Sequence, residues 1–197
     1  LHRDVVPGDS VNEVVAKVLD HSIQAMIDVR ANAATMPFDE ALNAMMPARQ
    51  LIFAGLGASG IVSRDACQKF FRLGIPCSVA VDTPAILQTA AIVDERDVLI
   101  ITSHTGVWPD VARAATIAAG NGATVIALTE PGSLLARNAS LVFECHTPED
   151  TNVYTPMSSR LAHLALFDAL QVALALKLGE SADLMLRRSK EALANRP

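Results

Sequence analysis

Short apolar runs alternate with helical patterns along most of this 197-residue chain. The runs lie near residues 51–55, 76–81, 97–102, 123–128 and 140–145, and each is long enough for a buried strand but too short for an independent helix. Repeated strand–helix units form a parallel sheet, because right-handed helical crossovers lie on its faces. The alternation therefore predicts a doubly wound α/β fold, with five parallel strands and helices on both faces.

Helical patterns also extend beyond these runs at both ends of the chain. Near the N-terminus, Ser10 and Glu13 have the spacing of a capping box, in front of an apolar stripe that begins at Val11. We expect residues 1–36 to be a linker and an N-terminal helix, and residues 37–197 to be the α/β core of a single domain. The expected helices span residues 11–31, 37–46, 59–73, 83–93, 109–120, 132–138, 157–178 and 180–194.

The composition argues against several kinds of function. Sixteen Lys and Arg against 21 Asp and Glu give a net charge of −5, which disfavours direct binding of nucleic acid. The most apolar stretch, residues 161–178, is interrupted by polar side chains, so a buried helix is favoured over a membrane span. The three cysteines lack metal-ligand spacing and are expected to be reduced thiols of a cytoplasmic protein. We expect no metal, no cofactor and no membrane partner.

Two loops rich in glycine and serine follow the first and the third apolar runs. Residues 55–60 (GLGASG) follow the first, and residues 103–106 (SHTG) follow the third. A turn from a buried strand into a helix presents free backbone N–H groups at the positive end of the helix dipole, where anions bind. Because both loops carry hydroxyl groups and neither carries Lys or Arg, they predict a site for a phosphorylated, hydroxyl-rich small molecule.

The first loop also fits the dinucleotide pattern G-x-G-x-x-G, with Asp82 as the candidate ribose ligand. In the dinucleotide-binding strand order 3-2-1-4-5-6, the second wall of the site would be residues 129–132, which include a carboxylate and a proline without an N–H. In the flavodoxin-like order 2-1-3-4-5, the second wall is residues 103–106, with two hydroxyl groups. That chemistry favours the flavodoxin-like order.

The two loops, together with residues 156–161 before an Ala/Leu-rich helix, resemble the SIS (sugar isomerase) phosphosugar-binding domain. The chain is most similar to the C-terminal effector domain of RpiR-family transcription regulators of the HexR type. The resemblance implies a three-layer α/β sandwich, a phosphosugar effector, a homodimer or higher oligomer, and a DNA-binding helix-turn-helix domain upstream of Leu1. It nominates 2-keto-3-deoxy-6-phosphogluconate as the ligand. HexR-type sequences usually carry an arginine directly after the glycine of the second loop, where this chain has Val107.

The resemblance implies that loop hydroxyls and amides contact the ligand, chiefly those of Ser59 and Ser103. His104 is expected to line the crevice rather than to act as a base. Trp108 could cover the ligand or pack on a neighbouring helix, and packing is the preferred interpretation. Arg160 is a candidate for a cation near the phosphate or for an ordinary surface ion pair. The candidate ligand-binding residues are Ala58, Ser59, Ser103, His104, Thr105, Gly106, Glu149, Ser159 and Arg160, and no catalytic residue is assigned.

The helix expected over residues 157–178 is apolar on nearly every side. One side must face the sheet, and another needs a cover. A second copy of the chain is one such cover, and the helices at 11–31 and 180–194 are the alternative. We expect the second copy, since the family resemblance also implies a dimer.

A sugar-phosphate aldose–ketose isomerase would use the same pocket and is the main alternative function. Isomerisation needs a base beside the reacting carbons, and isomerases of this family commonly have glutamate after the glycine of the second loop. Val107 stands there and cannot move a proton, so a binding domain without catalysis is favoured. An NAD-binding oxidoreductase is the third hypothesis, but no group for hydride-transfer acid/base chemistry is evident downstream.

Overall fold

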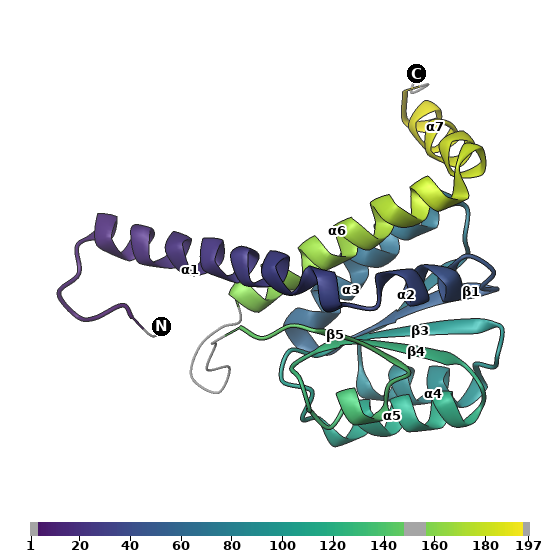
Figure 1. Ribbon diagram of the computed structural model, residues 1–197, viewed down its shortest axis with the longest axis horizontal. Helices are drawn as coiled ribbons and strands as arrows, with labels where there is room; N and C mark the ends of the chain where they lie inside the picture. Colours follow the sequence, from purple (N-terminus) through teal and green to yellow (C-terminus); the bar gives the residue numbers. More distant parts are fainter. Residues whose placement is uncertain (1–3, 148–156, 195–197) are drawn as a thin grey trace.

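The computed structural model describes residues 4–147 and 157–194. Figure 1 shows a parallel sheet in the middle of the molecule with helices on both faces. The strand order is β2-β1-β3-β4-β5, and all neighbouring pairs are parallel. The flavodoxin-like order is therefore confirmed, and the dinucleotide-binding order is wrong for this chain. The strands are β1 (Gln50–Ala54), β2 (Cys77–Ala80), β3 (Asp97–Thr102), β4 (Thr124–Thr129) and β5 (Leu141–Glu144).

The helices follow the predicted pattern with one exception. Residues 132–138 form no α-helix, only the 3-10 turn η3 (Ala136–Asn138). The hydroxyl of Ser133 accepts the N–H of Ala136, with the spacing of an N-cap, and hydrogen-bonds to Thr129, but the turn that follows ends at Asn138, shortly before β5. The α-helices of the described residues are α1 (Val11–Asn32), α2 (Phe38–Met45), α3 (Gly57–Phe70), α4 (Thr83–Ile92), α5 (Pro109–Gly120), α6 (Ser158–Leu178) and α7 (Glu180–Ala194).

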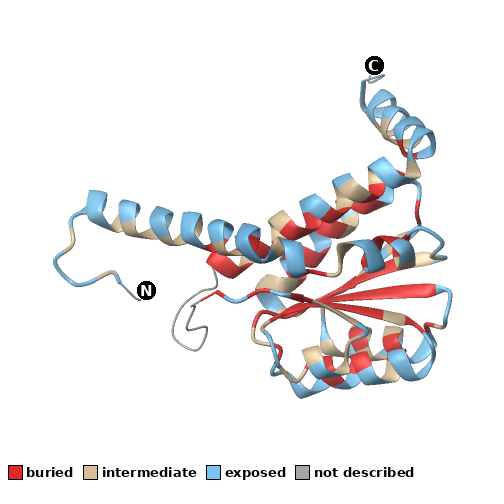
Figure 2. Ribbon diagram, in the orientation of Figure 1, coloured by how far each residue is buried: buried red, intermediate tan, exposed pale blue. Residues whose placement is uncertain are grey.

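Two apolar clusters hold helices on opposite faces of the sheet. Alternate residues of β1 point to opposite faces, so Phe53 belongs to the cluster with α2, α3 and α6, and Ile52 to the cluster with α4 and α5. The Phe53 ring lies 5.2 Å from that of Phe70 and 5.7 Å from that of Phe167, measured between centroids. Figure 2 shows the buried strands between these helical layers.

Helix α1 projects from the body of the molecule (Figure 1). Its C-terminal half lies against α6 and buries Ala25 and Val29. Its N-terminal half exposes Val11 (78%) and Val15 (51%), although the capping box at Ser10 forms as predicted. The apolar stripe predicted at the start of this helix therefore does not pack into the core of its own chain.

Helix α6 is covered in part by other helices of the same chain. It contacts α1, α2, α3 and α7, which leaves Leu161, Val172 and Leu176 exposed on its surface. By length and composition alone, α6 is the one helix of the described residues that could cross a membrane. Its buried residues, including Leu166 and Leu170, belong to the core cluster on the sheet.

Candidate functional site

The carboxyl ends of β1 and β3 bring the two glycine-serine loops together. The two strands are neighbours in the sheet, with Ala54 paired to Ile101, so residues 55–60 and 103–106 leave the sheet side by side. The helix after β1 lies on one face of the sheet and the helix after β3 on the other. Ligands of open α/β sheets bind at such a switch point, in the crevice between the two loops.

A cavity of about 120 Å³ opens at this edge of the sheet. Gly106 is buried beside the cavity without bordering it, and Glu149 lies outside the described residues. His163, which the sequence analysis did not single out as a ligand residue, borders the cavity one helical turn beyond Ser159. The residues that border it are Leu56, Ala58, Ser59, Ser103, His104, Thr105, Trp108, Val111, Ser159, Arg160 and His163.

The first loop enters its helix earlier than expected. Helix α3 begins at Gly57, with Leu56 as the N-cap, and no side chain caps it. Ser59 therefore lies inside the first turn, two residues after the start of the helix that was expected to begin at residue 59. The N–H groups of Gly57 and Ala58 have no acceptor within the helix and lie at the positive end of its dipole. This turn can thus offer an anion two amides and a hydroxyl group.

The glycine pattern of the first loop serves close packing of the turn. A Cβ on Gly60 would lie 2.8 Å from the carbonyl oxygen of Gly55, which is closer than real Cβ atoms approach. Asp82, the candidate ribose ligand, instead caps α4 by accepting the N–H of Ala85 at 2.8 Å. Helix capping thus accounts for the carboxylate of Asp82. Together with the strand order, this removes the basis for a dinucleotide-binding site.

The second loop is fixed by backbone hydrogen bonds to the β4 side of the site. The N–H of Ser103 donates to Leu128 at 3.0 Å, and the carbonyl of His104 accepts the N–H of Glu130 at 2.9 Å. Gly106 has a φ of +59°, which favours glycine, and its carbonyl accepts the N–H of Leu135. Ser103 and His104 are only 7% exposed. The loop is therefore held in place before any ligand arrives.

The start of α6 supplies the third part of the cavity wall. Ser159 and His163 are 2% and 1% exposed, and the rings of His163 and His104 lie 6.4 Å apart between centroids. Among the described residues, the buried Nε of Arg160 has no hydrogen-bond partner. An unpaired buried N–H of a guanidinium is costly unless an acceptor arrives, so this group is suited to an anionic ligand.

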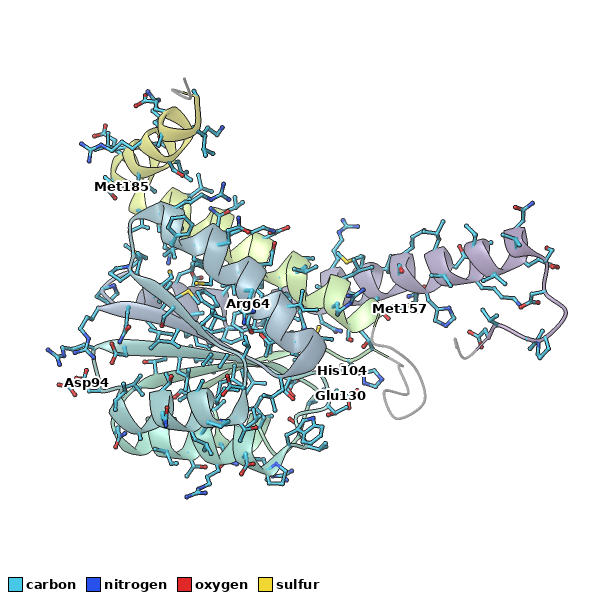
Figure 3. All side chains as sticks on the ribbon, turned by 180° about the vertical axis from the view of Figure 1, so that it is seen from behind. Arg64, Asp94, His104, Glu130, Met157 and Met185 are labelled. Carbon is cyan, nitrogen blue, oxygen red and sulfur yellow. The ribbon has the colours of Figure 1, made fainter. Side chains whose placement is uncertain are left out.

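Glu130 lies beside the cavity, between two imidazoles. Its Oε1 is 3.8 Å from Nε2 of His104 and 3.6 Å from Nδ1 of His146, and Figure 3 shows His104 and Glu130 close together. Within the described part of the chain, no group of three His, Cys, Asp or Glu side chains could hold a metal ion. A larger hollow of about 440 Å³ is lined by residues that include Met36, Glu144 and His146. Neither glycine-serine loop contributes to its wall.

Trp108 is positioned differently from the preferred expectation. It borders the cavity and is 59% exposed, so it covers part of the cavity mouth and is not buried against a neighbouring helix. The adjacent Val107 is 61% exposed and does not border the cavity. The second loop thus leads from buried polar residues to an exposed aromatic ring.

Sequence comparison identifies the family of the chain. The SIS domain model matches residues 44–173, and the chain belongs to the SIS domain family. Its homologues include HexR regulators. The HTH-type transcriptional regulator HexR of Escherichia coli (strain K12) is 35% identical over 193 residues, which cover 98% of this chain and 67% of that protein. The chain thus spans about two thirds of the length of this relative.

Solved structures share the fold. The Vibrio vulnificus NanR protein complexed with ManNAc-6P superposes with a TM-score of 0.83 at 20% identity, covering 95% of this chain and 69% of that one. The sugar isomerase domain of an RpiR transcription factor from Sphaerobacter thermophilus gives a TM-score of 0.78 at 23% identity, covering 89% and 97%. These likenesses agree with the observed strand order.

Proposed function

We propose that this chain is the effector-binding domain of a HexR-type transcriptional regulator and that it binds a phosphosugar in the cavity between the two loops. The observation that carries the proposal is the convergence, at the switch point, of the α3 N-terminus, the hydroxyls of Ser59 and Ser103, and the Nε of Arg160, which has no hydrogen-bond partner in the described part of the chain. The phosphate lies against the amides of Gly57 and Ala58, which a helix N-terminus offers to anions.

The proposed ligand is 2-keto-3-deoxy-6-phosphogluconate, the effector that the similarity to HexR nominates. Thr105 and Ser159 border the same cavity and add hydroxyl groups for the remaining oxygens. The structure of NanR with ManNAc-6P supports the ligand class, since that protein has the same fold and its ligand is a phosphosugar.

The domain acts as a sensor and not as an isomerase in this proposal. Val107 is exposed and carries no proton-transfer group, and Glu130 does not border the cavity. The regulator acts in the cytoplasm, and a helix-turn-helix domain outside this chain contacts DNA. The exposed apolar residues of α1 and α6, among them Val11, Leu19 and Leu176, support a homodimer.

The experiment that tests the pocket is titration calorimetry with serine variants. Ser59→Ala and Ser103→Ala each remove a hydrogen bond to a charged acceptor, worth roughly 1.5–3 kcal/mol, so each should weaken phosphosugar binding about tenfold or more. Ser78→Ala, on the exposed side of the edge strand β2, is the matched control and should bind like the wild type. Unchanged affinity in both pocket variants would contradict the proposed site.

Two further measurements separate a sensor from an enzyme. Proton exchange beside the ligand carbonyl, followed by NMR in heavy water, should show no acceleration by the protein. Protein-dependent exchange would favour the isomerase. In the full-length regulator, ligand affinity should differ with and without operator DNA, because the coupling between two sites is reciprocal. Equal affinities would contradict control of DNA binding by the ligand.

A further inference from the structure

We infer that Trp108 is the part of the cavity wall that contacts the carbon skeleton of the ligand, and that this contact sets which phosphosugars the domain accepts. The inference rests on the proposed function and adds to it a residue that selects among phosphosugars by their C–H surface.

Within the described part of the chain, no capping or hydrogen-bonding role of its side chain explains the position of Trp108. It is the N-cap residue of α5, but its side chain makes no capping hydrogen bond, and Pro109 fixes the first helical position without it. Its carbonyl accepts the N–H of Ala112 at 3.1 Å, a backbone bond that any residue could make. Tryptophan is highly buried on average, yet this residue is 59% exposed. The backbone is therefore anchored while the ring remains available at the cavity.

The cavity wall changes character from its buried to its exposed residues. Ser103, Ser159 and His163 are 7%, 2% and 1% exposed, whereas Trp108 is largely exposed. The buried part of the wall is polar, and the partly exposed start of α3 borders the same cavity with amides that suit the phosphate. Trp108 gives the exposed part of the wall an apolar surface. A ligand held by its phosphate at the start of α3 therefore extends its carbon skeleton along the cavity wall toward Trp108.

The small cavity volume supports this outer contact. At about 120 Å³ it is smaller than the about 300–1,000 Å³ of pockets that enclose small-molecule ligands. Part of a phosphosugar must then lie outside the enclosed space, against the residues of the mouth. An aromatic ring offers a large apolar face with negative electrostatic potential, which attracts the C–H groups of a sugar ring or chain.

Residue 107 does not supply this contact. Val107 is exposed and does not border the cavity, and it is not charged. An arginine, which HexR-type sequences usually carry here, would select anionic or hydroxyl groups by hydrogen bonds. Trp108 instead selects phosphosugars that present a continuous C–H surface on the side facing α5.

The chain contains a single tryptophan, so its fluorescence reports on this position directly. The whole chain would be titrated with glucose 6-phosphate, 2-keto-3-deoxy-6-phosphogluconate and inorganic phosphate, followed by calorimetry and by tryptophan emission. A phosphosugar that binds by calorimetry should change the emission, whereas inorganic phosphate should not. Trp108→Ala should weaken phosphosugar binding about tenfold, and Trp108→Phe should keep affinity within about threefold of the wild type. Val107→Ala is the matched control and should leave affinity unchanged.

The outcomes separate this inference from the proposed function. If Trp108→Ala binds the phosphosugar as tightly as the wild type while Ser103→Ala binds it weakly, the pocket stands and the role of Trp108 is overturned. If Trp108→Ala changes the oligomeric state in sedimentation without changing affinity, the ring belongs to an interface between copies, and the inference is again overturned. If no phosphosugar binds the wild type, the inference fails together with the proposed function.

Discussion

Two buried polar sites, at the amino ends and at the carboxyl ends of the parallel strands (the amino and carboxyl edges of the sheet), are in opposite conditions. At the amino edge, the carboxylate of Asp97 is 1% exposed and accepts from Nε of Arg49 at 2.9 Å, from a terminal nitrogen of Arg49 at 2.5 Å, and from the N–H of Asp94 at 3.0 Å. At the carboxyl edge, the buried Nε of Arg160 and hydroxyl of Thr102 have no hydrogen-bond partner among the described residues. Figure 3 shows Asp94 at one end of the sheet and His104 at the other.

This difference separates stability from binding. A buried polar group whose hydrogen bonds are all made within the protein stabilises the fold, as at Asp97. A buried polar group without a partner costs stability and recovers that free energy when a ligand supplies the missing acceptor or donor. Changes at the amino edge should therefore affect unfolding, and changes at the carboxyl edge should affect affinity.

The largest expected effect is loss of stability in Asp97→Asn. Removing one partner of a buried ion pair leaves the other partner uncompensated, and the partial exposure of Arg49 reduces the cost to about 2 kcal/mol in the free energy of unfolding. Urea denaturation at pH 7 measures it. The exposed neighbour Glu95 provides the control, since Glu95→Gln should change stability by less than about 0.5 kcal/mol. A weakened phosphosugar affinity in Asp97→Asn would break the division between the two edges.

The same variant should show a characteristic pH dependence. Burial alone would raise the pKa of Asp97, but its hydrogen bonds with Arg49 and the Asp94 amide outweigh burial and lower that pKa below its usual value of 3.8. The stabilisation is therefore present above the unfolded pKa of about 3.9 and is lost as the pH falls through the folded pKa. The stability gap between the wild type and Asp97→Asn should shrink below about pH 4. A gap that is equal at pH 7 and pH 3 would contradict this assignment.

Much of the fold could be predicted from the sequence because burial and chain connectivity both act locally. Each apolar run became a strand, and the comparison of residues 103–106 with residues 129–132 led to the observed strand order. The segment expected as a helix over 132–138 forms only one 3-10 turn, whose start the Ser133 hydroxyl fixes by accepting the N–H of Ala136 and hydrogen-bonding to Thr129. The interaction with Thr129 depends on the position of β4, which no local pattern encodes.

The residues of the candidate site were predictable where they lie on the two loops, and less so elsewhere. Ser59 and Ser103 follow buried strands, so their place at the sheet edge follows from the topology. His163 was missed as a ligand residue, because a single histidine on an apolar helix is equally consistent with a core position. The exposure of Trp108 depends on how the ring leaves the α5 N-terminus, and periodicity does not determine that.

An intermediate effect is expected for Arg160, whose guanidinium side chain borders the cavity. Arg160→Ala should weaken phosphosugar binding about tenfold, because charge-assisted hydrogen bonds to phosphate are the stronger kind. Arg160→Lys should recover part of the affinity, since lysine keeps the charge but not the planar donors. Arg64→Ala, on the exposed side of α3 (Figure 3), is the control and should bind like the wild type. A large loss of stability in Arg160→Ala with unchanged affinity would make Arg160 a structural residue and blur the division between the edges.

The smallest effect is expected for the ion pair at the carboxyl edge. Nδ1 of His146 lies 3.6 Å from Glu130, but the His146 side chain is 69% exposed, and water screens such a pair. His146→Gln should therefore change the free energy of unfolding by less than about 0.5 kcal/mol, and phosphosugar affinity by less than about twofold. Urea denaturation and calorimetry of this variant, beside Asp97→Asn, compare an exposed and a buried carboxylate pair in one protein. If His146→Gln lost as much stability as Asp97→Asn, charge pairing would stabilise both edges alike. Polar groups at the carboxyl edge would then contribute to the free energy of unfolding as those at the amino edge do, and the two edges would no longer differ in function.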